Sequence, residues 1–193
     1  MPDPARGGSP VDLRRAFRLD ASSVWVVTSA DAGSPVGFTA VSVASVSLAP
    51  PILSFNVSRT SSSLATLLRS GRYAVHLLAA DQEQTARRFA GPAPLRFADA
   101  RTWSWDDDGL PRVRGTLTRL SGAVLRLVDA GDSVLVLGEV DRSDEDDDGA
   151  ASSTRERGAD RRLYRGADDP LLHHARAYTR PGPVPARLAG AVA

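Results

Sequence analysis

Residues 37–63 read GFTAVSVASVSLAPPILSFNVSRTSSS, and this stretch decides the expected fold. It starts at a glycine, continues as a strand of alternating valine and serine, breaks at a Pro-Pro pair and runs as a second strand into a serine cluster. The apolar positions change parity once, between Val43 and Val46. Side chains of a strand alternate between two faces, so such a slip requires an extra residue absorbed as a β-bulge. We therefore expect a bulge near Ala44 and Ser45 that turns backbone polar groups toward a flat, polar-edged cofactor.

The composition is that of a soluble globular protein of one domain, with 193 residues, 42% hydrophobic residues and 24% charged residues. All 24 basic residues are arginine, and the chain contains neither lysine nor cysteine. Without lysine there is no Schiff-base chemistry, including that of pyridoxal phosphate. Without cysteine there is no disulfide, thiolate nucleophile or iron–sulfur cluster.

The formal net charge of +1 gives no field that would draw the protein to nucleic acid or to a membrane surface. No apolar run approaches the roughly 18 residues of a membrane-spanning helix, and the N-terminus has no apolar signal core. The expected location is therefore the cytoplasm, with no nucleic-acid or membrane partner.

Composition divides the chain into one domain and three loose segments. Residues 1–8 are a polar lead-in that we expect to be disordered, and residues 9–180 form the domain. Residues 141–162 are acidic first, basic afterwards and almost free of apolar side chains, so they are expected to form a mobile loop. Residues 181–193 are a tail rich in proline, alanine and glycine.

Hydrophobic patterning predicts short strands with a few small helices between them. The helices are expected around 13–17, from Leu64 to a C-terminal glycine at 71, and at 81–90 with Asp81 and Gln84 as a capping box. Further strands are expected at 24–29, from 36, at 73–78, 113–120, 123–128 and 133–140, with an irregular segment at 91–111. About seven strands without βαβ alternation favour an antiparallel barrel or sandwich.

The clearest candidate site is the hydroxyl-rich segment before Leu64. Hydroxyl groups, one guanidinium and the free N–H groups of a helix start would converge there on an anion such as a phosphate. The alternative is a helix N-cap with redundant serines. The residues of this candidate site are Asn56, Ser58, Arg59, Ser62 and Ser63.

The remaining candidates are weaker. On the helix at 81–90, Phe89 lies on the apolar side, Arg87 is expected in solvent, and Arg88 could face either a ligand or water. His76 lies within an apolar strand and is expected in the core, whereas His173 and His174 lie on a segment that could fold over a pocket. No histidine pair has metal-ligand spacing, so no metal site is predicted.

Five blocks of the sequence, taken in order, resemble those of the flavin reductase-like proteins. These small split-barrel proteins bind FMN and serve as reductase partners of two-component flavin monooxygenases. The resemblance covers roughly residues 13–180. The blocks are GFTAVSVASVSLAPPILSFNVSRTSSS, GRYAVHLLAADQEQTARRFAG, GLPRVRGTLTRL, DAGDSVLVLGEV and DPLLHHARAY.

The resemblance implies a mainly β fold, an antiparallel Greek-key split barrel with two to four short peripheral helices. It also implies a homodimer that binds FMN or FAD near its interface and uses NADH or NADPH as co-substrate. The segment from Thr39 to Ser42 would meet the isoalloxazine edge, residues 58–63 would take the phosphate, and the helix with Arg88 and Phe89 would face the flavin. The cofactor-binding residues expected in all are Thr39, Ala40, Val41, Ser42, Ser45, Asn56, Ser58, Arg59, Ser62, Ser63, Arg88 and Phe89.

The nicotinamide or substrate side is expected at Asp132, Ser133, His173 and His174. Family members commonly have Gly-Asp-His where this chain has Gly131-Asp132-Ser133, and often asparagine where it has Val41. Three hypotheses follow. The first is an NAD(P)H-dependent reductase that supplies reduced flavin to a monooxygenase. The second is a flavin-retaining oxidoreductase that acts on another organic substrate, and the third is a non-catalytic binding protein.

Overall fold

The computed structural model describes residues 12–144 and 169–182. The lead-in at 1–8, most of the charged segment at 141–162 and most of the tail at 181–193 lie outside the described residues. The first residues of the charged segment are not a loop, however, because the last strand of the barrel continues through Ser143. Arg142 and Ser143 pair there with the preceding strand of the hairpin, so the last strand runs past its predicted end at residue 140.

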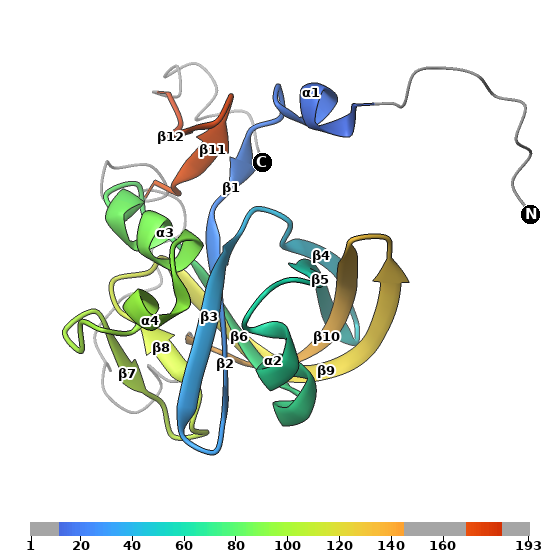
Figure 1. Ribbon diagram of the computed structural model, residues 1–193, viewed down its shortest axis with the longest axis vertical. Coiled ribbons are helices and arrows are strands. Elements are labelled where there is room, and N and C mark those ends of the chain that lie inside the picture. Colours follow the sequence, from blue (N-terminus) through green and yellow to red (C-terminus); the bar gives the residue numbers. More distant parts are fainter. Residues whose placement is uncertain (1–11, 145–168, 183–193) are drawn as a thin grey trace, which may run out of the picture.

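The main body is a seven-stranded antiparallel sheet with the order β3-β2-β6-β9-β10-β5-β4. Its strands are β2 (Trp25–Asp31), β3 (Ser34–Ala40), β4 (Ala44–Leu48), β5 (Pro51–Ser58), β6 (Arg72–Leu77), β9 (Thr118–Ala130) and β10 (Ser133–Ser143). Figure 1 shows this sheet curving round on itself, with the long β9–β10 hairpin on one side. Val27 of β2, Phe55 of β5 and Val136 of β10 lie in one buried core, so strands far apart in the order face each other. The predicted mainly β antiparallel barrel is confirmed.

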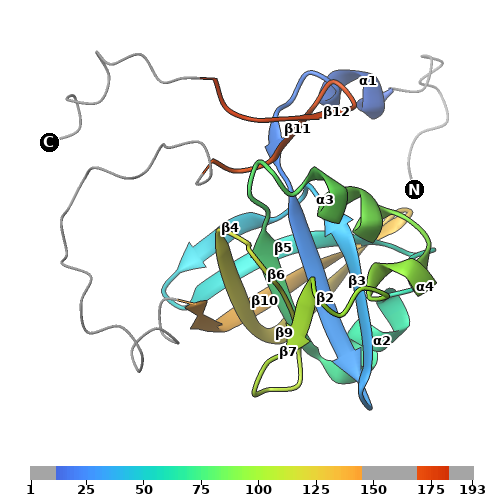
Figure 2. The ribbon, with the colours of Figure 1, turned by 90° about the vertical axis from the view of Figure 1, so that its left-hand side faces the viewer.

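The described residues include four short helices outside the barrel, at the upper end of the predicted number. They are α1 (Leu13–Phe17), α2 (Leu64–Ser70), α3 (Glu83–Ala90) and α4 (Ala93–Arg96). Figure 2 shows α3 and α4 beside β3. A second buried cluster, which includes Val26, Ala86 and Phe89, packs α3 against the outside of the barrel.

Two small sheets complete the described chain. One joins β7 (Trp103–Trp105) and β8 (Pro111–Val113), and the other has the order β1-β11-β12. In the second, β1 (Ser22–Ser23) pairs with β11 (Leu172–His174), which forms a hairpin with β12 (Ala177–Thr179). This sheet lies with α1 beyond one end of the barrel (Figure 1).

The helix ends follow the sequence signals only in part. Gly71 ends α2 in the left-handed conformation, with φ of 62°, and its N–H donates to the carbonyl of Leu67 as predicted. The capping box at Asp81 and Gln84 is wrong, because α3 begins at Glu83. The side-chain oxygen of Gln82 accepts instead from the N–H of Ala79.

Gly122 is inside a strand, although the sequence predicted a break at Ser121-Gly122. β9 continues from Thr118 to Ala130, and Gly122 pairs with Val140 of β10. A Cβ at position 122 would overlap the backbone carbonyl of Glu139, so the glycine allows two strands to approach closely. The predicted strand at 113–120 is likewise two pieces, since Val113 ends β8 and Thr118 begins β9.

The bulge expected in the central stretch lies one residue further along. The β4–β5 register shifts between Ser45 and Ser47, so Val46 is the extra residue. The chain also leaves the sheet between Ala40 and Ala44, where it crosses from one end strand, β3, to the other, β4. Among the described strands, none pairs with this outer side of β3.

Candidate functional site

The outer edge of β3 carries the first part of the candidate site. The carbonyl of Gly37 points away from β2 and accepts hydrogen bonds from Arg96 Nη1 at 2.8 Å and from Ser63 Oγ at 3.2 Å. Backbone groups of alternate residues in an antiparallel strand point the same way, so the N–H and C=O of Thr39 face this edge too. At the crossing to β4, Ser42 Oγ accepts from the N–H of Asn56 at 3.0 Å. The edge is thus a line of backbone groups that a polar ring can pair with.

One end of this edge is a serine–arginine corner, formed by Gly37, Ser62, Ser63 and Arg96. Arg96 Nη1 lies 3.3 Å from Ser62 Oγ and 3.4 Å from Ser63 Oγ. The other guanidinium nitrogens donate to the carbonyl of Gly91 at 3.0 and 2.8 Å. A small cavity of about 60 Å³ opens between these groups and Phe97. The corner therefore presents a fixed cation and a hydroxyl group to one small volume.

The charge of Arg96 is not neutralised within the described part of the chain, where no ion pair includes it. Partial burial lowers the pKa of its guanidinium. An arginine held by three carbonyl contacts and facing two hydroxyls is suited to bind an anion. Sequence reasoning missed Arg96 because α4 has only four residues and no apolar periodicity within the segment predicted to be irregular.

Ser63 is 2% exposed, and it does not act as a helix cap. It precedes α2 but has helical backbone angles and makes no side-chain capping bond, so the N-cap alternative is wrong for this residue. Its hydroxyl donates to Gly37, which ties the start of α2 to β3. Ser62 is exposed beside it and is the hydroxyl of the pair that a ligand can reach.

Arg59 turns toward the β9–β10 hairpin. Its Nη2 pairs with Asp129 at 2.5 Å, its Nε donates to the carbonyl of Gly131 at 3.0 Å, and its N–H donates to the carbonyl of Asp132. Ser58 is in register with Ser133. The structure therefore brings Asp132 and Ser133 next to residues 58–59, and the predicted role of Arg59 at a phosphate stays a prediction.

The other end of the β3 edge opens into a pocket of about 300 Å³, here called the His173 pocket. Its lining joins the α1–β1 link, the end of β3 and the β11–β12 hairpin: Phe17, Arg18, Asp20, Val41, His173, Ala175 and Arg176. The ring of His173 packs edge-on against Tyr178, with centroids 5.6 Å apart. The structure thus joins Val41 and His173 as one site, whereas His174 is exposed and does not line the pocket.

The helix α3 supports the β3 edge. Thr39 Oγ1 donates to the carbonyl of Ala86 at 2.6 Å, which holds its hydroxyl against α3. Phe89 is 1% exposed and packs edge-on against Phe97 beneath β3, and its expected place beside a flavin stays a prediction. Arg88 is half-buried and donates to Thr102 Oγ1 at 2.9 Å.

Arg87 is exposed, as expected, and it also makes two surface contacts. It pairs with Glu83 one helical turn away and lies over the ring of Tyr178, 5.1 Å from its centroid. Through Tyr178 and His173 it helps to hold the β11–β12 hairpin beside α3.

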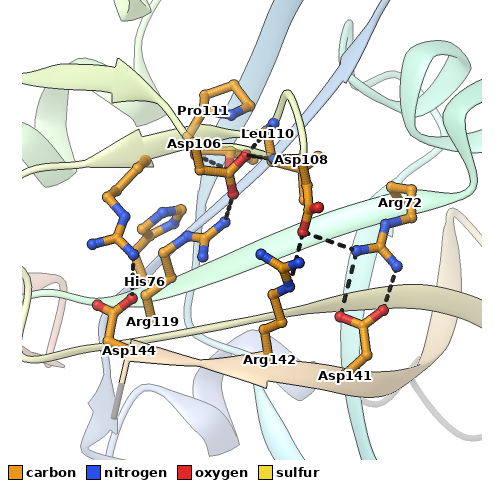
Figure 3. Close-up of polar contacts among 12 residues, drawn as sticks. Arg72, His76, Asp106, Asp108, Leu110, Pro111, Arg119, Asp141, Arg142 and Asp144 are labelled. Atoms are coloured by element: carbon orange, nitrogen blue, oxygen red, sulfur yellow. Dashed lines mark hydrogen bonds and ion pairs between the residues drawn. The ribbon is translucent and has the colours of Figure 1, made fainter. Parts of the chain in front are cut away.

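A charged network, centred on the pair Arg119 and Asp106, lies beside β6, β9 and β10 (Figure 3). Arg119 is 2% exposed and pairs with Asp106, while Arg142 pairs with Asp108 and Arg72 with Asp141. The network borders a polar cavity of about 350 Å³. Its cations all have acidic partners, which marks the network as a structural feature.

His76 lies beneath this network and is fully buried, as predicted for a core residue. Its Nδ1 donates to the carbonyl of Val26 at 3.1 Å. Burial, and next the charge of Arg119, lower its pKa to about 3, so the ring is neutral in the folded protein.

Within residues 12–144 and 169–182, no group of three or more His, Asp or Glu side chains is arranged to hold a metal ion. In the same ranges, no helix has both the length and the apolar character needed to cross a membrane.

Comparisons with known proteins give one consistent family. The model of the flavin reductase like domain matches residues 17–182. An NADH:FMN oxidoreductase of Rhodococcus qingshengii is 39% identical over 185 residues, which are 95% of this chain and 88% of that protein. The reductase subunit HsaB of a flavin-dependent monooxygenase from Rhodococcus jostii (strain RHA1) is 35% identical over 142 residues, 72% of each chain.

A solved structure extends the likeness to three dimensions. The Streptomyces globisporus C-1027 NADH:FAD oxidoreductase SgcE6, in complex with NAD and FAD fragments, has a TM-score of 0.71 and 30% identity. The match covers 91% of this chain and 98% of that one. It therefore takes in most of the barrel and its surrounding elements.

Proposed function

Because the chain belongs to the flavin reductase-like family, we propose that it transfers hydride from NADH or NADPH to FMN or FAD and passes the reduced flavin to a partner monooxygenase. One observation carries this proposal beyond the likeness to relatives. The β3 edge joins the serine–arginine corner at Gly37 to the His173 pocket at Val41. Gly37 and Val41 are four positions apart, which is about 13 Å along extended chain. A single elongated ligand with a ring and an anionic end fits along such an edge.

The residues present fit a flavin nucleotide. We propose that Ser62 and Arg96 hold the phosphate, with Ser58, Arg59 and Ser63 around it, and that Arg88 stands at the α3 side. Backbone groups from Thr39 to Ser42 would pair with the polar edge of the isoalloxazine, close to Ser45 and Asn56. When bound, the flavin supplies a ring that accepts hydride.

This chain's own residues contribute orientation and exclusion of water. Val41 and Phe17 give the His173 pocket an apolar surface, on which a nicotinamide ring can lie beside the flavin edge. The Thr39–Ala86 hydrogen bond and the buried Phe89 keep the edge straight from behind. Asp132 and Ser133 lie at the opposite end, beside Ser58, so of the residues expected on the nicotinamide side only His173 lines this pocket.

We also propose that the protein is a homodimer. Leu13 and Phe17 of α1 are 62% and 69% exposed. Val46 and Leu48 on the end strand β4 are exposed as well. Exposed apolar groups on this scale are typical of an interaction surface. A reductase that draws on nicotinamide nucleotides works where these are kept reduced, so we place it in the cytoplasm.

The test is oxidation of NADH and NADPH by the purified protein, followed by absorbance with and without added FMN or FAD. We expect turnover that depends on added flavin. Absence of turnover with either nucleotide would refute the reductase. Flavin that stays bound through gel filtration would favour the flavin-retaining oxidoreductase, and no flavin affinity in titration would favour the binding protein.

The serine at 133 allows a sharper version of this test. Ser133→His restores the Gly-Asp-His of related proteins at a position in register with Ser58. Because the residue lies away from the His173 pocket, we expect turnover to stay the same or to improve.

A further inference from the structure

The His173 pocket has an apolar, partly aromatic floor and a basic rim. We call the apolar and aromatic lining residues Val41, Phe17 and His173 its floor, and the basic lining residues Arg18 and Arg176 its rim. Its one acidic group, Asp20, accepts a hydrogen bond from Ser22 Oγ at 2.8 Å. In the described ranges no ion pair includes Arg18 or Arg176, so the rim is cationic. An apolar floor with a cationic rim suits a flat heteroaromatic ring that carries phosphate groups.

The backbone of the β11–β12 turn is strained at both of its central residues. Ala175 and Arg176 are its two central residues, with φ of 52° and 68°. This turn normally uses Asn-Gly or another pair that accepts positive φ, and neither alanine nor arginine does so readily. Strain of this kind persists where the surrounding structure enforces it, and it is frequent at ligand sites.

The strained turn is fixed in place by neighbouring backbone. The N–H of Ala175 donates to the carbonyl of Arg18 at 3.1 Å, and β11 pairs with β1 through Ser22 and His173. The two arginines of the rim therefore come from adjacent, mutually bonded segments. Their spacing is set by the backbone and does not depend on long flexible loops.

We propose that Arg18 and Arg176 bind the phosphate groups of the nicotinamide nucleotide, with its nicotinamide ring against Val41 and His173. The inference rests on the proposed reductase function and adds residues that hold the co-substrate. It separates the two nucleotides in space, with the flavin phosphate at Arg96 and the nicotinamide phosphates at Arg18 and Arg176.

The experiment compares Arg18→Ala, Arg176→Gly and the double variant with the wild type. Glycine at 176 removes the guanidinium and relieves the positive φ, so the turn is retained or stabilised. We expect KM for NADH and NADPH to rise about fivefold for each single change and more for the double variant, with kcat little changed. Arg176→Lys should restore part of the affinity, and FMN affinity should stay at the wild-type value.

The matched control is Arg15→Ala with Arg180→Ala, which removes the same charge from the same two regions without touching the pocket lining. It should leave KM unchanged.

Direct titration of the flavin-loaded proteins with NAD⁺ separates this inference from the proposed function. A wild type that binds NAD⁺ without turnover refutes the reductase, and the inference stands if the double variant binds more weakly. Equal NAD⁺ affinity and KM in the wild type and the double variant, or no NAD⁺ binding by either, would overturn it.

Discussion

The serine–arginine corner and the charged network of Figure 3 both fix guanidinium groups, but in opposite chemical settings. In the network, Arg119 is buried and faces the carboxylate of Asp106. In the corner, Arg96 is half-buried and faces carbonyls and hydroxyls, with no acid beside it in the described chain. A buried cation with its own acid is neutralised internally, whereas a held cation without one is available to an anionic ligand.

The difference between the two regions indicates which of the many arginines of this chain are associated with function. Composition alone does not distinguish them, because every basic residue of the chain is arginine. The partner of each guanidinium does. On this basis the network should matter for stability and the corner for ligand affinity.

The largest effect is expected for Asp106→Asn. Asparagine keeps an oxygen for the N–H groups of Asp108 and Leu110, which Asp106 Oδ1 accepts at 3.0 and 2.7 Å, but leaves Arg119 without its countercharge. We expect the free energy of unfolding, measured in urea, to fall by about 3–5 kcal/mol. FMN affinity should not change.

A matched control for this change is Asp31→Asn, which breaks the exposed pair with Arg69. Its effect on unfolding should be below about 1 kcal/mol. Equal losses in the two variants would show that burial does not distinguish the network from an ordinary surface pair.

Stability should also depend on pH through His76, whose pKa is lowered mainly by burial and next by the charge of Arg119 in the network. Its pKa is about 3 when folded, against 6.5 ordinarily, so below pH 6.5 the unfolded chain binds a proton that the folded protein does not. As the pH is lowered from about 6.5 to 3, the free energy of unfolding should therefore fall, and this group contributes up to about 1.4 kcal/mol per pH unit to that fall. Arg119 and Arg112 both act to keep the ring neutral.

The measurement is urea unfolding of the wild type and His76→Asn at several pH values in that window. The asparagine amide can donate to Val26 in place of Nδ1 but does not titrate. The carboxylates of the network contribute alike to both proteins, so the difference between the curves isolates the histidine. Parallel curves would contradict a buried neutral His76.

Local sequence patterns predicted most of the antiparallel strands, because strand periodicity and glycine signals act over a few residues, whereas the choice of a barrel over a sandwich came from the family resemblance. The parity slip in the central stretch located the bulge to within one residue, at Val46. Gly122 misled because a glycine demanded by close strand approach looks in sequence like a glycine in a turn. That distinction depends on Glu139 of the neighbouring strand, which no local window contains.

The candidate site was predictable only where neighbours in sequence are neighbours in space. The β3 edge and the serines of residues 58–63 follow from one continuous stretch. Arg59, however, pairs with Asp129, which is 70 residues away in sequence. His173 comes to lie beside Val41 through long-range contacts such as the β1–β11 pairing. Arg96 was not predicted for the same reason. What distinguishes it is that no acidic side chain of the described residues pairs with it, and no local sequence motif reveals this.

The third experiment compares Arg96→Gln directly with Arg59→Ala. Glutamine can keep part of the hydrogen bonding to Gly37 and Gly91 while it removes the charge, so we expect the Kd for FMN to rise about tenfold to a hundredfold with little loss of stability. Arg59 already satisfies its charge at Asp129, so its removal should raise this Kd by less than about fivefold. Riboflavin, which has no phosphate, should bind the wild type and Arg96→Gln with nearly equal affinity. The opposite ranking of the two arginines would assign the phosphate to Arg59 and would break the rule that an unpartnered cation marks the site.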